Sequence, residues 1–234
     1  MNKILEVNNL HKKYGKTHAV KGVSFDVKKG SIVGLLGPNG SGKTTIIKTI
    51  MSLISDYEGD VAILGKKPGP IANSLISYLP DVAHMPTWLK VNQAINFFSD
   101  FYADFDTTRA RDMLENMKIP LNKRIKTLSR GMQEKVQLSL VMSRRASLYV
   151  LDEPIGAVDP ASREFIISTI LKNFNEDGAL LISTHIIADI EPILDVAIFL
   201  REGEIVLNND VDSIREDENK SLDQLFREVF KNVV

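Results

Sequence analysis

The chain has 234 residues, of which 44% are hydrophobic and 25% are charged, and its formal net charge is −1. This length is enough for one compact α/β domain or for a domain with a subdomain, while the near-neutral balance excludes a global electrostatic field for nucleic acid or an anionic membrane. The chain contains no cysteine, which excludes a disulfide framework and a thiolate metal site and fits a reducing compartment.

The first residues, 1–7, are interrupted by charge too soon to form a signal peptide. No apolar run approaches the ~20 residues that a membrane-spanning helix needs. We therefore expect a cytoplasmic protein without a membrane span of its own, which would serve a membrane process only through a partner.

Two kinds of strand are predicted. Three segments alternate between apolar and polar residues, as half-buried antiparallel strands do: residues 5–7, 23–27 and 61–64. Three others are short continuous apolar runs, which suit strands of a parallel sheet covered by helices on both faces: residues 32–36, 148–151 and 179–182. Together with the helical patterns between them, these segments predict an α/β fold.

A glycine-rich segment lies between the apolar run 32–36 and a helical pattern at 45–50. It consists of Gly37, Pro38, Asn39, Gly40, Ser41, Gly42, Lys43, Thr44 and Thr45. In a P-loop the glycines let backbone N–H groups converge on phosphate oxygens, Lys43 reaches the β- and γ-phosphates, and the Thr44 hydroxyl can ligate Mg²⁺. The alternative is a glycine-rich turn whose lysine points to water. The strand–loop–helix setting favours a nucleotide-phosphate site.

The middle of the chain has little strand signal but clear helical periodicity, at residues 92–102, 107–117 and 129–144. This pattern predicts an inserted helical subdomain over residues 82–146. Ser129 is a good N-cap for the last helix, and Gly131 exposes backbone N–H groups, so this terminus can attract an anion. An ordinary capped helix is the local alternative.

Aromatic residues follow at helical spacing in the same region. We predict that Phe97, Phe98 and Phe101 build the core of the helical subdomain. Met85 and Trp88, which flank a proline in a predicted loop, are the better candidates for contact with a partner.

The apolar run 148–151 ends in two acidic residues, Asp152 and Glu153. Strand ends of a parallel sheet face the ligand crevice, so these carboxylates are expected beside the P-loop phosphates. Asp152 can orient Mg²⁺, and Glu153 can polarise the attacking water. Taken alone, two such acids are more often a solvated turn or a helix cap, but next to an intact P-loop they indicate catalysis.

The last part of the chain has strand-like segments at 196–200 and 204–207 and an amphipathic helical segment at 222–230. We predict a single ATPase domain over residues 1–234. It divides into a nucleotide-binding core with a β subdomain, a helical subdomain and a helical tail, at residues 1–80 with 147–210, 82–146 and 211–234.

With these segments in this order, the chain resembles the nucleotide-binding domains of ATP-binding cassette (ABC) transporters over residues 3–210. The matching elements are an aromatic residue, the P-loop, the signature loop, the acidic strand end, the D-loop and the switch histidine: Tyr14, 37–45, 128–132, 148–153, 156–159 and His185. The resemblance implies an α/β fold with a RecA-like P-loop NTPase core, an antiparallel β subdomain and an inserted α-helical subdomain.

The resemblance also implies roles that the residues alone leave open. Tyr14 would stack on adenine, which gives affinity with little base discrimination. Ser129 and Gly131 would bind the γ-phosphate held by the P-loop of an opposite subunit, and His185 would contact that same phosphate. ATP would then join a head-to-tail dimer, either of identical chains or with a related cassette. Without this context, Tyr14 and His185 would more often be structural.

Two departures from the family's pattern stand out. Asp81 occupies the position where glutamine is usual; its carboxylate can approach Mg²⁺ directly or through water but cannot donate an amide hydrogen bond. Asp81 therefore joins Thr44 and Asp152 as a candidate metal-proximal residue. Arg130 and Met132 replace the commoner glycine and glutamine of the signature loop, whose phosphate-contacting residues remain.

Two classes of function fit such a cassette. The favoured one is the ATP-hydrolysing motor of a bacterial ABC transporter, with separate transmembrane permease subunits at the inner face of the cell membrane. The apolar segment 81–89 lies where the family receives these subunits, and segments 78–81 and 128–132 look most like exporters of antibiotics or amphipathic peptides. The alternative is a soluble ABC ATPase that acts on protein assembly, ribosomes or nucleic acid. Cassettes of chromosome maintenance contain a very long coiled coil that this length excludes, and translation-type members usually carry two cassettes in one chain, so no nucleic-acid partner is predicted.

Overall fold

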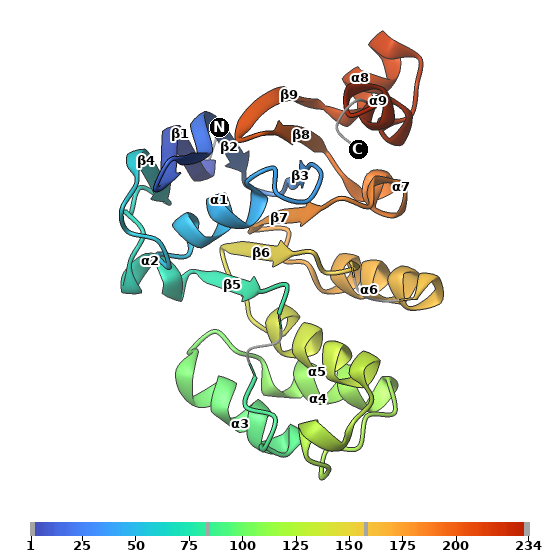
Figure 1. Cartoon of the computed structure of the whole chain (residues 1–234). Coiled ribbons are helices and arrows are strands. Elements are labelled where there is room, and N and C mark those ends of the chain that lie inside the picture. The colour runs from blue at the N-terminus through green and yellow to red at the C-terminus, as the bar shows by residue number, and fades with distance from the viewer. Residues whose placement is uncertain (1–2, 83–84, 157–158, 232–234) are drawn as a thin grey trace.

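The computed structural model describes residues 3–82, 85–156 and 159–231, whose strands form two sheets (Figure 1). The smaller sheet is antiparallel, in the order β2-β1-β4, and consists of β1 (Lys3–Tyr14), β2 (Thr17–Lys28) and β4 (Glu58–Ile63). The larger has the order β5-β6-β7-β3-β8-β9, and all its neighbours are parallel except β8 and β9. Its strands are β5 (Ile76–Leu79), β6 (Leu148–Asp152), β7 (Ala179–Thr184), β3 (Ile32–Leu36), β8 (Val196–Arg201) and β9 (Glu204–Asp210).

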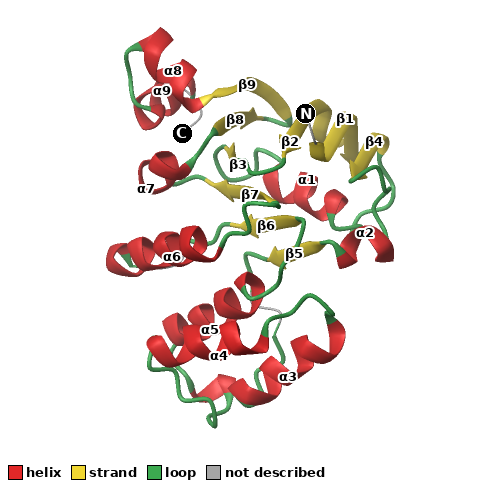
Figure 2. Ribbon diagram, turned by 180° about the vertical axis from the view of Figure 1, so that it is seen from behind, coloured by secondary structure: helices red, strands yellow, loops and turns green. Residues whose placement is uncertain are grey.

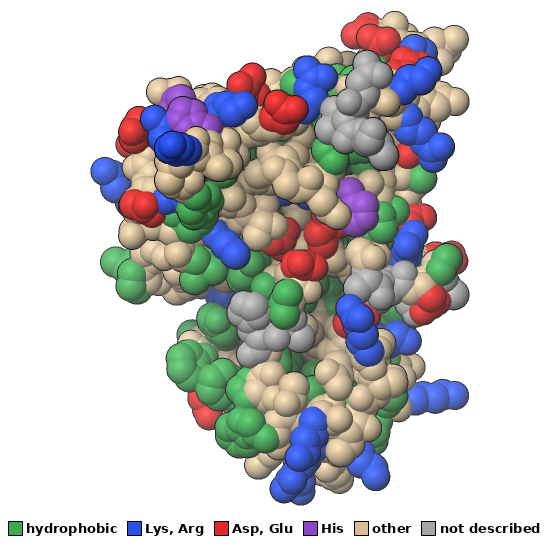
Figure 3. Space-filling model, in the orientation of Figure 1, with side chains coloured by type: hydrophobic (Ala, Val, Ile, Leu, Met, Phe, Trp, Pro, Cys, Tyr) green, Lys and Arg blue, Asp and Glu red, His purple; other side chains and the backbone are tan. Residues whose placement is uncertain are grey.

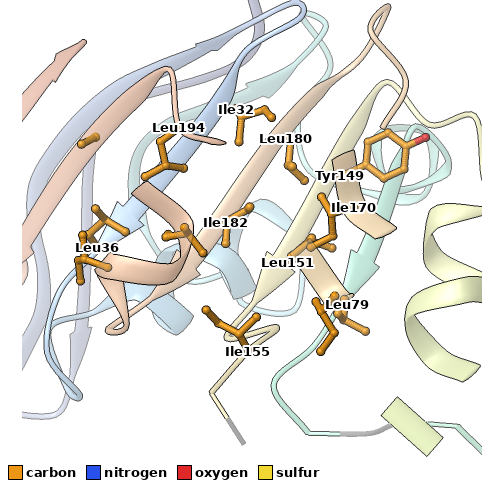
Figure 4. Packing of buried hydrophobic residues seen from close by; sticks show 14 of the residues in the cluster. Ile32, Leu36, Leu79, Tyr149, Leu151, Ile155, Ile170, Leu180, Ile182 and Leu194 are labelled. Carbon is orange, nitrogen blue, oxygen red and sulfur yellow. The ribbon is translucent and has the colours of Figure 1, made fainter. Parts of the chain in front are cut away.

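The central strands β3, β6 and β7 are buried at every position. In β3, Ile32 and Leu36 pack on one face of the sheet, and Val33 and Leu35 pack on the other. Figure 4 shows the packing on the first of these faces. Because both faces are covered, these strands need apolar residues at successive positions instead of alternate ones. The parallel pairing of β3 and β6 with β7 confirms the predicted strands.

Helices cover both faces of the larger sheet (Figures 1 and 2). Between the two sheets lies α1 (Lys43–Ile50), which buries Ile46, Ile47 and Ile50. The elements of the opposite face are α5 (Arg130–Met142), α6 (Pro160–Asn173), α7 (Ile187–Ile190) and η2 (Glu191–Ile193). The short α2 (Pro70–Ser74) precedes β5. Along the described stretches of the chain, no helix has the length and apolar character that a membrane crossing requires.

A helical subdomain lies between β5 and β6 and has a core of its own. It consists of α3 (Val91–Phe101), α4 (Thr107–Asn116), η1 (Ile125–Thr127) and α5. α5 also packs its other side against the larger sheet through Leu138, Val141 and Met142. The three helices predicted here are confirmed, and α5 joins the helical core to the sheet.

The predicted burial of aromatic residues in α3 is wrong for two of the three. Phe97 is 44% exposed and Phe101 is 70% exposed, whereas Phe98 packs against the helical core. α3 buries the face that carries Val91, Ala94 and Ile95. Positions 97 and 101 are one helical turn apart on another face, where their rings pack on each other with centroids 4.8 Å apart.

The C-terminal part forms two helices, α8 (Val211–Glu218) and α9 (Leu222–Val229). A capping box begins α9, since Ser221 accepts from the backbone N–H of Gln224 at 3.2 Å and Gln224 accepts in return at 3.1 Å. Phe226 of α9 packs edge-on against Phe199 of β8 with ring centroids 5.3 Å apart. The predicted amphipathic helix is confirmed, and its apolar face covers the end of the larger sheet.

Candidate nucleotide-binding and hydrolysis site

Two glycines shape the P-loop between β3 and α1. Gly37 lies so close to β8 that a Cβ atom would come within 2.4 Å of the carbonyl oxygen of Leu200. Gly42 is the N-cap of α1 and has a φ angle of 112°, which L side chains rarely adopt. No side chain caps α1, so its first backbone N–H groups remain available to a bound anion. Asn39 and Gly40 form the exposed tip of the loop.

The lysine of the loop is buried and lies between the loop and the acidic strand end. Lys43 is only 5% exposed, and its ammonium donates to the carbonyl oxygens of Gly37 at 2.7 Å and Pro38 at 3.2 Å. The same Nζ lies 3.3 Å from Oε1 of Glu153. A cation is therefore fixed where the loop, the start of α1 and the end of β6 meet.

Asp152, at the end of β6, is 1% exposed and is oriented by β7. Its Oδ1 accepts from the Ser183 hydroxyl, while its Oδ2 is buried and accepts no hydrogen bond from the described residues. Burial raises the pKa of the Asp152 carboxyl; the Ser183 and Thr44 hydroxyls oppose this rise, and the nearby charges of Asp81 and Glu153 reinforce it. A buried acceptor of this kind is suited to a cation.

Glu153 follows with a backbone conformation that is uncommon for a non-glycine residue, at a φ angle of 50°. Its backbone N–H donates to the carbonyl oxygen of Ser183 at 3.0 Å, which keeps this turn attached to β7. The side chain is 12% exposed, and Oε2 lies 3.0 Å from Nδ1 of His185. Glu153 therefore lies between Lys43 and His185, and the structure brings all three predicted residues together.

A cavity of about 530 Å³ adjoins Glu153 and lies between the ends of β5 and β6 and the helix α5. Asp81 and Glu153 line it from the ends of β5 and β6, and Arg130 and Glu134 line it from α5. Burial raises the pKa of the nearby Tyr78 hydroxyl to about 12, and the charges of Asp152 and Asp81 add to this effect. Figure 3 shows acidic side chains gathered beside a histidine in the middle of this face. The charge of Asp81 acts on both Tyr78 and Asp152, so Asp81 belongs to an acidic group at the strand ends.

The remaining predicted residues lie on other elements. Ser129 is the N-cap of α5 and accepts from the backbone N–H of Met132 at 3.3 Å. The space around the Gly131 Cα is open, because a Cβ there would meet no atom within 4 Å. Tyr14 is 49% exposed at the end of β1, and the Lys12 ammonium lies 4.7 Å from its ring centroid. These residues offer exposed groups at two places outside the Lys43 cluster.

Sequence reasoning missed the support that these side chains receive. Ser183 holds both Asp152 and Glu153, and its only signal was a hydroxyl residue in an apolar, buried strand. Lys12 had no signal; it is 3% exposed and is held under Tyr14 by Asp56, whose Oδ1 lies 2.6 Å from its Nζ. Positions 157–158 of the predicted D-loop and positions 83–84 of the apolar segment lie outside the described residues.

Four features together define a P-loop nucleoside triphosphatase. They are an uncapped helix after a glycine loop, a buried lysine, an aspartate with a free buried oxygen and an adjacent glutamate. The family model described as ABC transporter matches residues 20–156. The chain is 32% identical to the linearmycin resistance ATP-binding protein LnrL of Bacillus subtilis, over 87% of this chain and 68% of that protein. It is 29% identical to the SkfA peptide export ATP-binding protein SkfE of Bacillus subtilis, over 87% of each chain.

A solved ATP-binding subunit of an ABC transporter has the same fold, with a TM-score of 0.87 at 26% identity over 96% of this chain and 98% of the other. The chain therefore belongs to the ABC transporter family. It is an ATP-hydrolysing transporter subunit, and the predicted P-loop NTPase core with an antiparallel β subdomain and a helical insertion is confirmed. Cassettes of this family bind ATP and act as dimers with transmembrane partners.

Proposed function

We propose that this chain is the ATP-driven motor of a bacterial exporter of antibiotics or amphipathic peptides, held at the inner face of the cell membrane by separate transmembrane permease subunits. Relatives named for linearmycin resistance and for export of the SkfA peptide support this proposal. The soluble alternative gains no support from them. The observation that carries the membrane partner is an exposed apolar surface around α3.

We assign the nucleotide contacts residue by residue. Tyr14 stacks on adenine, and its exposed ring leaves one face open for this. The P-loop binds the phosphates through Gly37, Pro38, Asn39, Gly40, Ser41, Gly42, Lys43, Thr44 and Thr45. The uncapped start of α1 and the buried Lys43 support this assignment, since both favour an anion at the same place.

We assign Mg²⁺ to the oxygens of Thr44, Asp152 and Asp81. The free buried Oδ2 of Asp152 and the hard oxygen donors fit this metal. Within the described ranges, no group of three or more His, Cys, Asp or Glu side chains is placed to hold a metal by itself, so phosphate oxygens of ATP would complete the shell. When bound, Mg²⁺ supplies positive charge that offsets the negative charge of the transferring phosphoryl group.

Asp81 gives the test of this metal site. Asp81→Asn removes one carboxylate charge and is expected to raise the Mg²⁺ concentration for half-maximal ATP hydrolysis by about tenfold. Asp81→Gln is expected to restore function in part, because it supplies the amide that the family usually has here. Both values come from Mg²⁺ titrations of the hydrolysis rate at fixed ATP concentration.

The matched control is Asp112→Asn, which makes the same change at an exposed position of α4. Indistinguishable Mg²⁺ requirements in wild type and Asp81→Asn would mean that Asp81 is not part of the metal site. Both Asp81 variants would then hydrolyse ATP normally alone and fail only in stimulation by the membrane partner, as expected of a residue that only shapes its loop.

In the proposed catalytic step, Glu153 accepts a proton from the attacking water and His185 contacts the γ-phosphate. The position of Glu153 supports this role, because its carboxylate lies between Lys43 and His185, on the P-loop side of β6. His185 is 40% exposed, so one side of its ring is accessible to a phosphate. The two groups that flank the carboxylate, the Lys43 ammonium and the His185 ring, hold it in one orientation.

The site is proposed to be completed by a second cassette, either an identical chain or a related one. Ser129 and Gly131 begin α5 on the helical subdomain, whereas the P-loop begins α1 on the other face of the sheet. A helix N-terminus with open space at Gly131 can accept a phosphate that another subunit presents. ATP then links two chains head to tail.

The apolar surface near α3 is proposed to receive the permease. We call it the α3 surface; of its large exposed side chains, Val82 and Trp88 precede α3, and Phe97 and Phe101 lie on it. Figure 3 shows hydrophobic side chains gathered over α2 and α3 on this side of the molecule. Trp88 and Phe101 are 66% and 70% exposed, which is costly in water unless a partner covers them. Met85, in contrast, packs against the helical core and is not part of this surface.

Co-purification of the full chain from its native membranes tests the partner. The wild type is expected to retain a protein with several membrane spans, and the double variant Trp88→Glu, Phe101→Glu is expected to lose ~90% of it, as removal of central apolar anchors does. The matched control is Leu171→Glu on α6, an apolar residue 45% exposed outside this surface. Equal recovery by the double variant and the wild type would contradict the proposed surface.

A further inference from the structure

A buried cation lies directly after α5, away from the nucleotide site. Arg144 is 2% exposed, and its Nε and Nη2 donate to the two carboxylate oxygens of Asp104 at 3.0 and 3.1 Å. Nη1 donates to the carbonyl oxygen of Ile76, and Nη2 donates also to the carbonyl oxygen of Ser74. The Tyr102 ring lies beside the guanidinium plane, with its centroid 3.8 Å from Cζ. Only the planar fork of an arginine can make all these contacts at once.

The partners of Arg144 come from two different parts of the molecule. Ser74 and Ile76 belong to the core, where α2 ends and β5 begins. Tyr102 and Asp104 belong to the connection between α3 and α4 in the helical subdomain. Arg144 therefore joins the helical subdomain to the core at one point, and a rotation of either part would break hydrogen bonds of a buried charge.

Both α5 and β5 extend from Arg144 toward the same cavity, although α5 ends near Arg144 and β5 begins there. The last turn of α5 lies beside the start of β5, where the Ser77 hydroxyl donates to the carbonyl oxygen of Val141 at 2.7 Å. At their other ends, Arg130 of α5 and Asp81 after β5 line the same cavity of about 530 Å³. Figures 1 and 2 both place α5 next to β5. The angle between the two elements at Arg144 thus sets the separation of their functional ends.

The length of α5 amplifies small changes of that angle. Its 13 residues span roughly 20 Å at 1.5 Å per residue. A tilt of about 6° at Arg144 would therefore move the start of α5 by about 2 Å, and misplacement of a contacting group by ~1 Å is enough to impair a site. Ser129 and Gly131 stand at this start.

We propose that Arg144 is a positioning residue for ATP-driven closure. By fixing the angle between α5 and β5, it places Ser129 and Gly131 where they can meet the phosphate of a second cassette. This inference rests on the proposed role of those two residues in the dimer. A lysine at position 144 keeps the charge but not the fork, so it can hold the core carbonyls or the Asp104 carboxylate and not both.

The test compares the same substitution at two neighbouring arginines. In the full chain carrying Glu153→Gln, Arg144→Lys is expected to weaken ATP-dependent dimerisation roughly tenfold, an effect within the usual range of coupling between sites. Arg145→Lys is the matched control, since Arg145 is 71% exposed and pairs only loosely with Asp106 at 3.4 Å. Dimerisation is measured by analytical ultracentrifugation with ATP and Mg²⁺, and ATP affinity of the monomer by titration calorimetry.

A second variant, Asp104→Asn, keeps the shape of the carboxylate and removes its charge. It is expected to weaken dimerisation as well, with ATP affinity of the monomer unchanged, and it decides the matter alone if Arg144→Lys does not fold. A role in stability only would lower the unfolding temperature and leave the dimer Kd of folded protein at the parent's value, and that result would overturn the inference.

Ser129→Arg in the same background separates this inference from the proposed function. If Ser129→Arg still dimerises, the proposed contact across the dimer is wrong, and with it the basis of the positioning role. If Ser129→Arg blocks dimerisation while Arg144→Lys and Asp104→Asn dimerise normally, only the role of Arg144 is wrong.

Discussion

Glu153→Gln is expected to lower the ATP turnover rate by ~10²-fold or more while ATP affinity is retained. Glutamine keeps the size of the side chain but cannot accept a proton from water. The neighbouring Asp152 and Lys43, which we assign to the metal and the phosphates, are unchanged. The ATP-bound dimer should then accumulate, because the step that dissolves it is blocked.

Steady-state hydrolysis and ATP titration calorimetry on the same preparation measure both parts of this expectation. Glu216→Gln, the same change at an exposed position of α8, serves as the control and should leave both values unaltered. Unchanged hydrolysis in Glu153→Gln would rule out Glu153 as the group that activates water.

Ser129→Arg is expected to abolish ATP-driven dimerisation and to reduce hydrolysis to the level of the isolated monomer. The long side chain would fill the space in front of the α5 terminus, where the open surface at Gly131 is proposed to receive a phosphate. ATP binding to the monomer should be spared, since the P-loop is on a different element. In the wild type, hydrolysis per subunit should rise with protein concentration, and a specific activity independent of concentration in a monomer would contradict the two-site arrangement.

The control for Ser129→Arg must account for the loss of a helix cap, which costs about 0.5–2 kcal/mol of stability. Ser221 provides a close match. It caps α9 by accepting from the N–H three residues on at 3.2 Å, as Ser129 does for α5 at 3.3 Å. Ser221→Arg should therefore lose comparable stability and keep full dimerisation. Equal loss of dimerisation in both variants would assign the effect to stability instead of the site.

The central strands and the P-loop could be predicted from sequence because local composition decides them. A strand covered on both faces needs apolar residues in succession, and β3, β6 and β7 have little else. Periodicity also located α3, but it could not tell which face of the helix is buried when aromatic residues occur on two faces. For this reason the predicted burial of Phe97 and Phe101 is wrong.

Contacts between distant segments could not be predicted in the same way. The approach of Glu153 to His185 spans 32 positions and depends on the pairing of β6 with β7. Ser183 and Lys12 support the site from positions that have no motif. Arg144 is a residue type that is rarely buried, so nothing in its sequence context indicates a buried joint.

The ion pair between Lys43 and Glu153 makes the carboxylate a competitor of phosphate for one ammonium group. Oε1 of Glu153 is buried and accepts no hydrogen bond from the described residues, so the Lys43 ammonium 3.3 Å away is the group that faces its charge. Under the roles proposed for these two residues, a γ-phosphate that draws the ammonium toward itself leaves this oxygen open to water, so arrival of the triphosphate and exposure of the proposed base would be one event. After cleavage, Glu153 holds the proton taken from water and has to pass it to the product phosphate or to solvent; its carboxylate can then pair with Lys43 again, which favours departure of the product phosphate.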